Sequence, residues 1–245
     1  MKKLIIATLS VALLSGAAFA ASHTQKVRMG TEGAYPPYNF VNDKGEIDGF
    51  ERELGDKLCE LAKLDCTWVK NDWDSIIPNL VSGNYDTIIA GMSITGERDK
   101  VIDFTQEYFP PDPSAYVAKK GASTDGTSGV VATQKATIQA GHVATTKATV
   151  VEFATADETI AAVRSGEADS VLADKAFLSP IVKESNGELV FVGKDVDIGG
   201  GVGIGVRESD GELKGKLNAA IDAMKKDGSL VKLIAKWFDG RMVKF

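Results

Sequence analysis

Short apolar runs alternate along this chain with longer stretches in which apolar residues recur every three or four positions. The runs suit buried strands of a parallel sheet, and the longer spacing is typical of amphipathic helices. The clearest helix begins at Phe50 and continues through Leu54, Leu58 and Leu61. Because strands and helices alternate, the pattern predicts an α/β fold.

The predicted elements fall into two series. In the first, strands are expected at 27–29, 66–69, 87–90 and 101–104, with helices from residue 50 and over 76–81. In the second, strands are expected at 130–133, 149–151, 170–172 and 189–192, with helices at about 137–144, 157–165 and 175–183. Two further helices, roughly 211–226 and 229–238, follow. Between the series, 109–113 has three prolines in four positions, which suits a crossing to a second unit.

The first twenty residues form a leader rather than part of the fold. Two lysines precede an apolar run, 4–14, which is too short to span a bilayer, and 18–20 (Ala-Phe-Ala) match a small-x-small cleavage site. We therefore expect a signal peptide over 1–20 and cleavage after Ala20. The remaining chain carries 26 basic and 34 acidic residues, a balance that argues against nucleic-acid partners and anionic lipid surfaces.

The two cysteines, Cys59 and Cys66, have six residues between them. In an exported chain this favours a disulfide. A metal pair would lack partners, because the only histidines are His23 and His142 and the cysteine spacing is not that of a zinc site. The glycine-rich stretch 199–206 carries no nucleotide-binding fingerprint, so we expect close backbone packing there and no cofactor.

The stretch 85–98 holds the strongest candidate for a binding site. Its predicted strand, 87–90, ends in small residues, and Ser93, Thr95 and Arg98 follow. Thr95 is placed to cap a helix, and a helix start beside an arginine suits a carboxylate, since arginine donates two parallel hydrogen bonds. The alternative is a capping threonine beside a surface arginine, and the local pattern leaves both open.

A second candidate is the loop 30–37, which follows the first predicted strand. Ligand groups usually lie just past the strand ends of an open α/β sheet, and glycines and prolines mark this segment as a loop. Glu32 and Tyr35 are its two chemically useful members. For Tyr35 the alternative is ordinary packing against the adjacent prolines.

Two segments of the chain resemble each other. Residues 73–86 and 156–169 share five identities in fourteen positions, and extending this alignment places Asp174 opposite Gly91. Two similar lobes would then offer Arg98 and Asp174 to one cleft. An arginine for a carboxylate and a carboxylate for an ammonium together recognise an α-amino acid. Alternatively, Asp174 only caps the helix that follows it.

Several motifs match one known family. They are 30–37 (GTEGAYPP), 49–51 (GFE) with Leu54, Cys59, 66–69 (CTWV), 73–80 (WDSIIPNL), 93–98 (SITGER) and 171–174 (VLAD). After its leader, essentially the whole chain resembles the periplasmic amino-acid-binding proteins of ABC transporters. The closest group looks like the lysine/arginine/ornithine-, histidine- and opine-binding members.

The resemblance implies a type II periplasmic-binding-protein fold, with two α/β lobes joined by a two-strand hinge. Lobe 1 would comprise 21–111 and 197–245, and lobe 2 would comprise 112–196. The protein would be a periplasmic monomer that captures a polar, basic L-amino acid, or an opine, in the cleft between the lobes. It would then deliver this small molecule to an inner-membrane ABC permease.

The resemblance also implies roles for eight cleft residues. Arg98 would bind the ligand α-carboxylate, and Asp174 would hold the α-ammonium. The others would complete the carboxylate site (Gly91, Ser93 and Thr137) or face the ligand side chain (Glu32, Tyr35 and Trp73). The resemblance further implies that Cys59 and Cys66 are bonded to each other.

The chain also departs from the family pattern. Ala136 stands where the family usually has glycine, so a requirement for φ > 0 there would strain the backbone beside Thr137. Alanine and glycine at 90–91 replace serines of the lysine/arginine binders. Glu32 between aromatic walls still favours a basic ligand, because a cation gains from both the carboxylate and the rings.

The main alternative function is an enzyme resembling cyclohexadienyl dehydratase, which shares this fold. Such an enzyme needs a positioned acid or base, and Glu32 and Asp174 are the obvious candidates. A receptor ligand domain is a third class and would need a tethered signalling module, which we do not expect. The motifs favour a binding protein rather than an enzyme.

Overall fold

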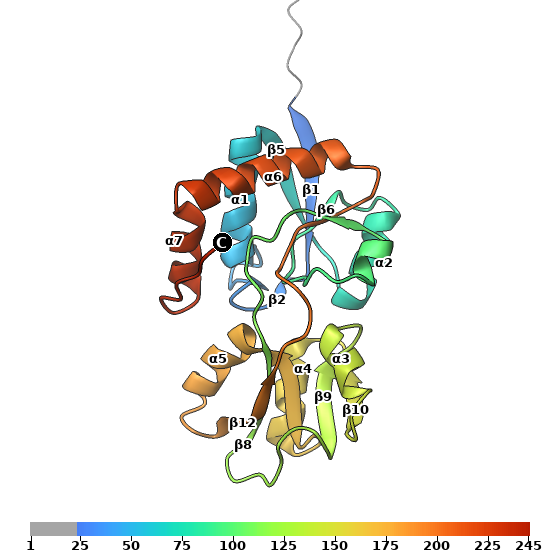
Figure 1. Cartoon of the computed structure of the whole chain (residues 1–245), viewed down its shortest axis with the longest axis vertical. Helices are drawn as coiled ribbons and strands as arrows, with labels where there is room; N and C mark the ends of the chain where they lie inside the picture. The colour runs from blue at the N-terminus through green and yellow to red at the C-terminus, as the bar shows by residue number, and fades with distance from the viewer. Residues whose placement is uncertain (1–23) are drawn as a thin grey trace, which may run out of the picture.

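The computed structural model describes residues 24–245, which form two α/β lobes, one above the other in Figure 1, with two chain segments running between them. The predicted signal peptide over 1–20 lies outside the described residues. Within 24–245, no helix is long and apolar enough to cross a membrane. The α/β class and the two-lobe arrangement are both confirmed.

Lobe 1 is built on a five-stranded sheet in the order β5-β1-β6-β13-β7. The strands are β1 (Gln25–Thr31), β5 (Leu64–Lys70), β6 (Thr87–Ile88), β7 (Asp103–Phe104) and β13 (Gly205–Val206). The first three run parallel, and β13 is antiparallel to β6 and β7. A small sheet adds β2 (Ala34–Tyr35), β3 (Asn39–Val41) and β4 (Ile47–Asp48). The helices are α1 (Phe50–Ala62), α2 (Ile76–Val81), α6 (Gly211–Lys226) and α7 (Ser229–Trp237).

Lobe 2 is built on a second five-stranded sheet in the order β10-β9-β11-β8-β12. The strands are β8 (Ser114–Lys119), β9 (Val130–Gln134), β10 (Thr149–Phe153), β11 (Ser170–Asp174) and β12 (Leu189–Val196). The helices are α3 (Ile138–Val143), α4 (Ala156–Ser165) and α5 (Lys175–Glu184). The pattern of apolar residues did not predict β8, which pairs antiparallel with β11 and β12 and makes this sheet mixed.

Two segments, 105–113 and 197–204, connect the lobes. They are joined at Val202, whose backbone pairs antiparallel with both Phe109 and Ser93. After Val202 the chain continues in lobe 1, where β13 lies in the sheet between β6 and β7. The glycine-rich stretch 199–206 therefore includes this connection, and a side chain at Gly201 would collide with Glu107. The lobe boundaries at 111/112 and 196/197 stay a prediction.

The predicted helix faces are buried with two exceptions, Leu61 on α1 and Val81 on α2, of which Val81 is 51% exposed. On α1, Phe50, Leu54 and Leu58 are fully buried, but Leu61 is 50% exposed. The buried face of α1 also includes Glu51 and Cys59, and Leu61 lies at the edge of this face. On α6 and α7 the predicted apolar residues pack into the core, as expected for amphipathic helices.

Two local predictions around the candidate site were wrong. The strand expected over 87–90 is only two residues long, because β6 ends at Ile88. The helix expected after Thr95 is a three-residue 3₁₀ turn, η2 (Arg98–Lys100). Thr95 nevertheless accepts a hydrogen bond from the Arg98 backbone N–H at 3.2 Å, as a capping residue does. A macrodipole is therefore not available to favour an anion there, and the side chains must supply the charge.

The predicted disulfide is confirmed. Cys59 in the last turn of α1 is bonded to Cys66 in β5, with their Cα atoms 6.2 Å apart. The bond ties a helix of lobe 1 to the edge strand of its sheet. Because Cys66 pairs with Val27 near the start of β1, the disulfide lies away from the strand ends that carry the candidate site.

Candidate ligand-binding site

A cavity lies between the lobes and is lined by residues of both. It contains all eight residues singled out from the sequence: Glu32, Tyr35, Trp73, Gly91, Ser93, Arg98, Thr137 and Asp174. Four further residues complete the lining: Ala90, Gln134, Ile138 and Gln139. The cavity sits at the carboxyl ends of strands of both sheets, where ligands bind in open α/β folds.

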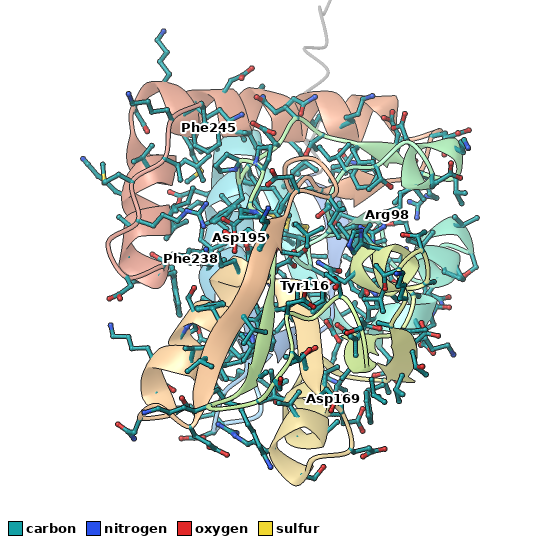
Figure 2. The ribbon with its side chains drawn as sticks, turned by 60° about the horizontal axis from the view of Figure 1, so that its bottom comes forward. Arg98, Tyr116, Asp169, Asp195, Phe238 and Phe245 are labelled. Carbon is teal, nitrogen blue, oxygen red and sulfur yellow. A yellow bond between two sulfur atoms is a disulfide. The ribbon has the colours of Figure 1, made fainter. Side chains whose placement is uncertain are left out.

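Arg98 reaches the cavity from the turn η2 of lobe 1. Figure 2 labels this side chain, which lies beside the yellow-green helix α3 of lobe 2. Its Nη1 donates to the Ser93 carbonyl at 2.9 Å, and its guanidinium carbon lies 5.3 Å from the Trp73 ring centre. Burial lowers the pKa of Arg98 to about 10, so the group is still a cation at neutral pH. Within residues 24–245 it forms no ion pair, which makes it a strong candidate to bind an anion.

Asp174 approaches the same cavity from the end of β11 in lobe 2. It occupies the N-cap position of α5 but makes no capping hydrogen bond with its side chain. Its carboxylate instead accepts from the Tyr35 hydroxyl at 2.8 Å and from Gln139 Nε2 at 2.9 Å. Burial raises the pKa of Asp174 to about 6. The alternative role of Asp174 as a simple helix cap is therefore wrong.

Glu32 forms a second carboxylate on the cavity wall and is only 4% exposed. One of its oxygens accepts from Gln134 Nε2 of lobe 2 at 2.6 Å. Burial raises the pKa of Glu32 to about 7, although the hydrogen bond from Gln134 opposes this shift. A buried carboxylate with an elevated pKa gains stability from a nearby cation, which would restore its charge.

The aromatic residues join the two lobes. The Tyr35 ring stacks on Phe177 of α5 with centres 4.3 Å apart and planes 9° apart. The Trp73 indole N–H donates to the Ala136 carbonyl of lobe 2 at 3.4 Å. Together with the Tyr35–Asp174 and Gln134–Glu32 hydrogen bonds, these contacts close the lobes on each other.

Gly91 and Thr137 use part of their hydrogen-bonding capacity within the protein. The Gly91 N–H donates to the buried Glu51 carboxylate at 2.6 Å, so this amide does not face the cavity. The Thr137 hydroxyl donates to the Gln134 carbonyl at 2.7 Å and accepts from the Ala140 N–H at 3.2 Å as the N-cap of α3. The Thr137 carbonyl also accepts from the Gly141 N–H, so the groups left for a ligand are the Gly91 carbonyl, an acceptor, and the Thr137 N–H, a donor.

The sequence did not single out Gln134, Gln139 or Phe177, although each touches a predicted site residue. Gln134 lies two residues before Ala136, where the chain departs from the family pattern, so a signal for it was present. Gln139 and Phe177 lie within helices and carry no comparable local signal. Their position depends on how the lobes meet, which the pattern of apolar residues does not encode.

Ala136 has φ of +58°, the left-handed conformation that favours glycine. We predict that Ala136→Gly raises the free energy of unfolding by about 0.5–1 kcal/mol, because relief of side-chain strain exceeds the added chain entropy. Chemical denaturation without ligand would measure this change as a higher midpoint at an unchanged slope.

The matched control is Ala161→Gly, at an exposed position inside α4. There the backbone is helical, so the same substitution is expected to lower the free energy of unfolding by about 1 kcal/mol. Equal losses in the two variants would contradict the inferred strain at Ala136.

Two lobes that close over a polar cavity at their strand ends define the class of type II periplasmic binding proteins. The chain belongs to the bacterial extracellular solute-binding proteins, family 3, which it matches over residues 27–240. The predicted family and a solute-binding rather than enzymatic role are thereby confirmed.

Similar proteins of known function cover nearly the whole chain. The L-arginine-binding protein of Pseudomonas aeruginosa is 35% identical over 260 residues, which span 97% of each chain. The lysine/arginine/ornithine-binding periplasmic protein of Escherichia coli K12 is 32% identical and spans 98% of each chain. A solved structure from Silicibacter pomeroyi, a periplasmic His/Glu/Gln/Arg/opine family-binding protein in complex with lysine, is 69% identical. It superimposes with a TM-score of 0.86 and covers 89% of this chain and 100% of that one.

Proposed function

We propose that this protein captures a basic L-amino acid in the interlobe cavity and delivers it to an inner-membrane ABC permease. The observation that carries the proposal is that Arg98 of lobe 1 and Asp174 of lobe 2 line one cavity. Similar proteins named for arginine and for lysine/arginine/ornithine support the ligand class. The proposal includes export with cleavage after Ala20, action in the periplasm as a monomer, and the lobe boundaries at 111/112 and 196/197.

In the proposed complex, each end of the ligand has its own partner. Arg98 would bind the α-carboxylate through parallel hydrogen bonds, supported by Ser93 and the Thr137 N–H. The Gly91 carbonyl, which cannot donate, would accept from the α-ammonium. Asp174 would hold the α-ammonium. The cationic side chain would lie between Tyr35 and Trp73, with its charge near Glu32, because a buried cation gains from aromatic faces and from a carboxylate.

The ligand would also stabilise the closed arrangement of the lobes. Hydrogen bonds from Tyr35 to Asp174 and from Gln134 to Glu32 already cross the cleft. A ligand held by Arg98 on one side and Asp174 on the other adds contacts available only when the lobes are closed. The closed form would then be the one that the permease recognises.

Isothermal calorimetry with a panel of amino acids tests this function. We expect L-arginine, L-lysine and L-ornithine to bind at about micromolar dissociation constants or tighter, which corresponds to about 8 kcal/mol. L-Glutamate is expected to bind more weakly, because its side-chain carboxylate would face Glu32. The opine octopine is the alternative ligand to include. Failure of every amino acid and opine to bind would refute the proposal, and tighter binding of L-glutamate would refute its ligand class.

The affinity for L-arginine is expected to fall as the pH is lowered from 8 to 5. The pKa of Glu32 is raised to about 7 and that of Asp174 to about 6, so acid neutralises both carboxylates in the free protein. A cationic ligand favours the ionised forms, so binding releases protons and weakens with acidification. Calorimetry across this range should show a loss of at least about tenfold.

Glu32→Gln is the control variant for this pH dependence. It should bind L-arginine more weakly at pH 8 and lose the part of the decline centred near the Glu32 pKa of about 7. An affinity that is constant, or that rises on acidification, would contradict the roles given to both carboxylates.

A further inference from the structure

Glu51 is a fully buried carboxylate that does not line the cavity. It lies in the first turn of α1 and forms no ion pair with any described residue. Its oxygens accept from the Tyr108 hydroxyl, from the Gly91 N–H at 2.6 Å and from Asn39 Nδ2 at 2.7 Å. A carboxylate without a cation is costly to bury, and three donors are what offsets that cost here.

The hydrogen bonds continue from Asn39 to a second loop. Asn39 is also fully buried, and its Oδ1 accepts from the Gly33 N–H at 2.6 Å. One unbroken series of hydrogen bonds therefore runs from Gly33 through Asn39 and Glu51 to Gly91. Gly33 and Gly91 have φ of +71° and +60°, so both are held in a conformation suited to glycine.

The two ends of this series lie in two of the segments of lobe 1 that line the cavity. Loop 32–35 carries Glu32 and Tyr35, and loop 90–93 carries Gly91 and Ser93. The third donor, Tyr108, lies in the connection between the lobes, and its backbone N–H donates to the Val202 carbonyl of the returning segment at 2.8 Å. One side chain thus joins both loops to the hinge.

We propose that Glu51 is a positioning residue, which fixes the two ligand-facing loops of lobe 1 relative to each other and to the hinge. This inference rests on the proposed function, because it assumes that the cavity binds an amino acid. Its physical basis is that groups held by buried, fully satisfied hydrogen bonds lose little conformational entropy when a ligand binds. The ligand would then bind to loops that are already in place.

The donors and acceptors around Glu51 allow a sharp test. In Glu51→Gln, the new NH₂ group faces either Asn39 Nδ2 or the donors at Gly91 and Tyr108. If the Asn39 amide turns to accept from it, the Gly33 N–H loses its acceptor. Every arrangement of the two amides therefore leaves either an unpaired N–H in one of the two loops or two NH₂ groups facing each other.

The double variant Glu51→Gln/Asn39→Asp exchanges the carboxylate and the carboxamide. The new carboxamide oxygen accepts from Gly91 and Tyr108, while its NH₂ donates to the new carboxylate. The other oxygen of that carboxylate accepts from the Gly33 N–H. Every hydrogen bond of the series is thereby restored, and the net charge of the pair is unchanged.

Calorimetry with L-arginine and proton–nitrogen correlation spectra provide the two readouts. Glu51→Gln is expected to weaken L-arginine binding by about tenfold or more and to move the amide resonance of Gly33 or Gly91 upfield, as a short hydrogen bond is lost. The double variant is expected to bind within about threefold of the parent protein and to restore both resonances. The control Glu60→Gln, on the same helix with a side chain 71% exposed, is expected to change neither.

Three outcomes would overturn the inference: L-arginine affinity within about twofold of the parent in Glu51→Gln, unmoved Gly33 and Gly91 resonances in that variant, or no recovery in the double variant. If the single variant fails to fold, the double variant decides, since recovery of folding and binding supports the inference and their absence refutes it. If the parent protein binds no amino acid, the proposed function fails, and the two glycine resonances alone decide the role of Glu51.

Discussion

Replacing Arg98 with alanine is expected to weaken L-arginine binding by about 3 kcal/mol or more, which is above a hundredfold. The guanidinium is partly buried, forms no ion pair within the described chain and lines the cavity. Its loss would leave the ligand α-carboxylate buried with no cation, and burying an unpaired charge is among the largest single costs in a binding site. Calorimetry at pH 7.5 would measure the change directly.

Two further variants separate charge from geometry at this position. Arg98→Lys keeps a cation but cannot donate two parallel hydrogen bonds, so its loss of affinity should fall between the parent and Arg98→Ala. Arg164→Ala removes a surface arginine of lobe 2, with a side chain 47% exposed and paired with Glu188, and should leave affinity unchanged. If Arg98→Ala binds L-arginine as tightly as Arg164→Ala does, Arg98 is not the carboxylate partner.

The helices and most strands were predictable because their signals are local. The apolar spacing in α6 predicted its bounds of Gly211–Lys226, and the burial of Leu213, Leu217 and Ile221 followed from the same spacing. Element ends were less accurate where backbone pairing decides them. β6 stops after two residues because its neighbour β13 pairs with it at a single position, Gly205 with Ile88.

The strand β8 illustrates what the pattern of apolar residues could not show. Residues 114–119 follow a proline-rich crossing, and all but Lys119 are buried, so polar and apolar positions do not alternate. What makes this segment a strand is its pairing with β11 and with β12, which begins seventy residues further along the chain at Leu189. Long-range pairing of this kind decides strand formation without a local signature.

The same distinction applies to the cavity. Arg98 and Asp174 were predictable as a pair because each follows a predicted strand, and strand ends meet at the ligand site of an open sheet. The partners of these residues were not predictable. Whether Asp174 caps α5 or accepts from Tyr35 depends on the closure of lobe 1 on lobe 2. Glu51 was visible in the sequence only as part of a motif, and its role depends on hydrogen bonds to three distant segments.

Asp174→Asn is expected to weaken L-arginine binding by about 2–4 kcal/mol, because the substitution removes the charge opposite the α-ammonium and keeps the size of the side chain. The pKa of Asp174 is about 6, so the parent carboxylate is ionised at pH 7.5 and the variant tests charge alone. The asparagine oxygen can still accept from Tyr35 or Gln139, so the hydrogen bond across the cleft need not be lost. Calorimetry and a ligand-free thermal melt would separate binding from stability.

A ligand without the α-amino group completes the argument. The compound 5-guanidinopentanoate keeps the carboxylate and the guanidinium of arginine but has no ammonium for Asp174 to hold. The parent protein should prefer L-arginine over this analogue by a large factor, and Asp174→Asn should reduce that preference to about threefold or less, since the two ligands differ only in the group that the variant no longer binds. Tyr35→Phe, which keeps the carboxylate and removes only its hydroxyl partner, should retain most of the preference. If Asp174→Asn prefers L-arginine over the analogue by the same factor as the parent protein does, then another group in the cavity binds the ammonium.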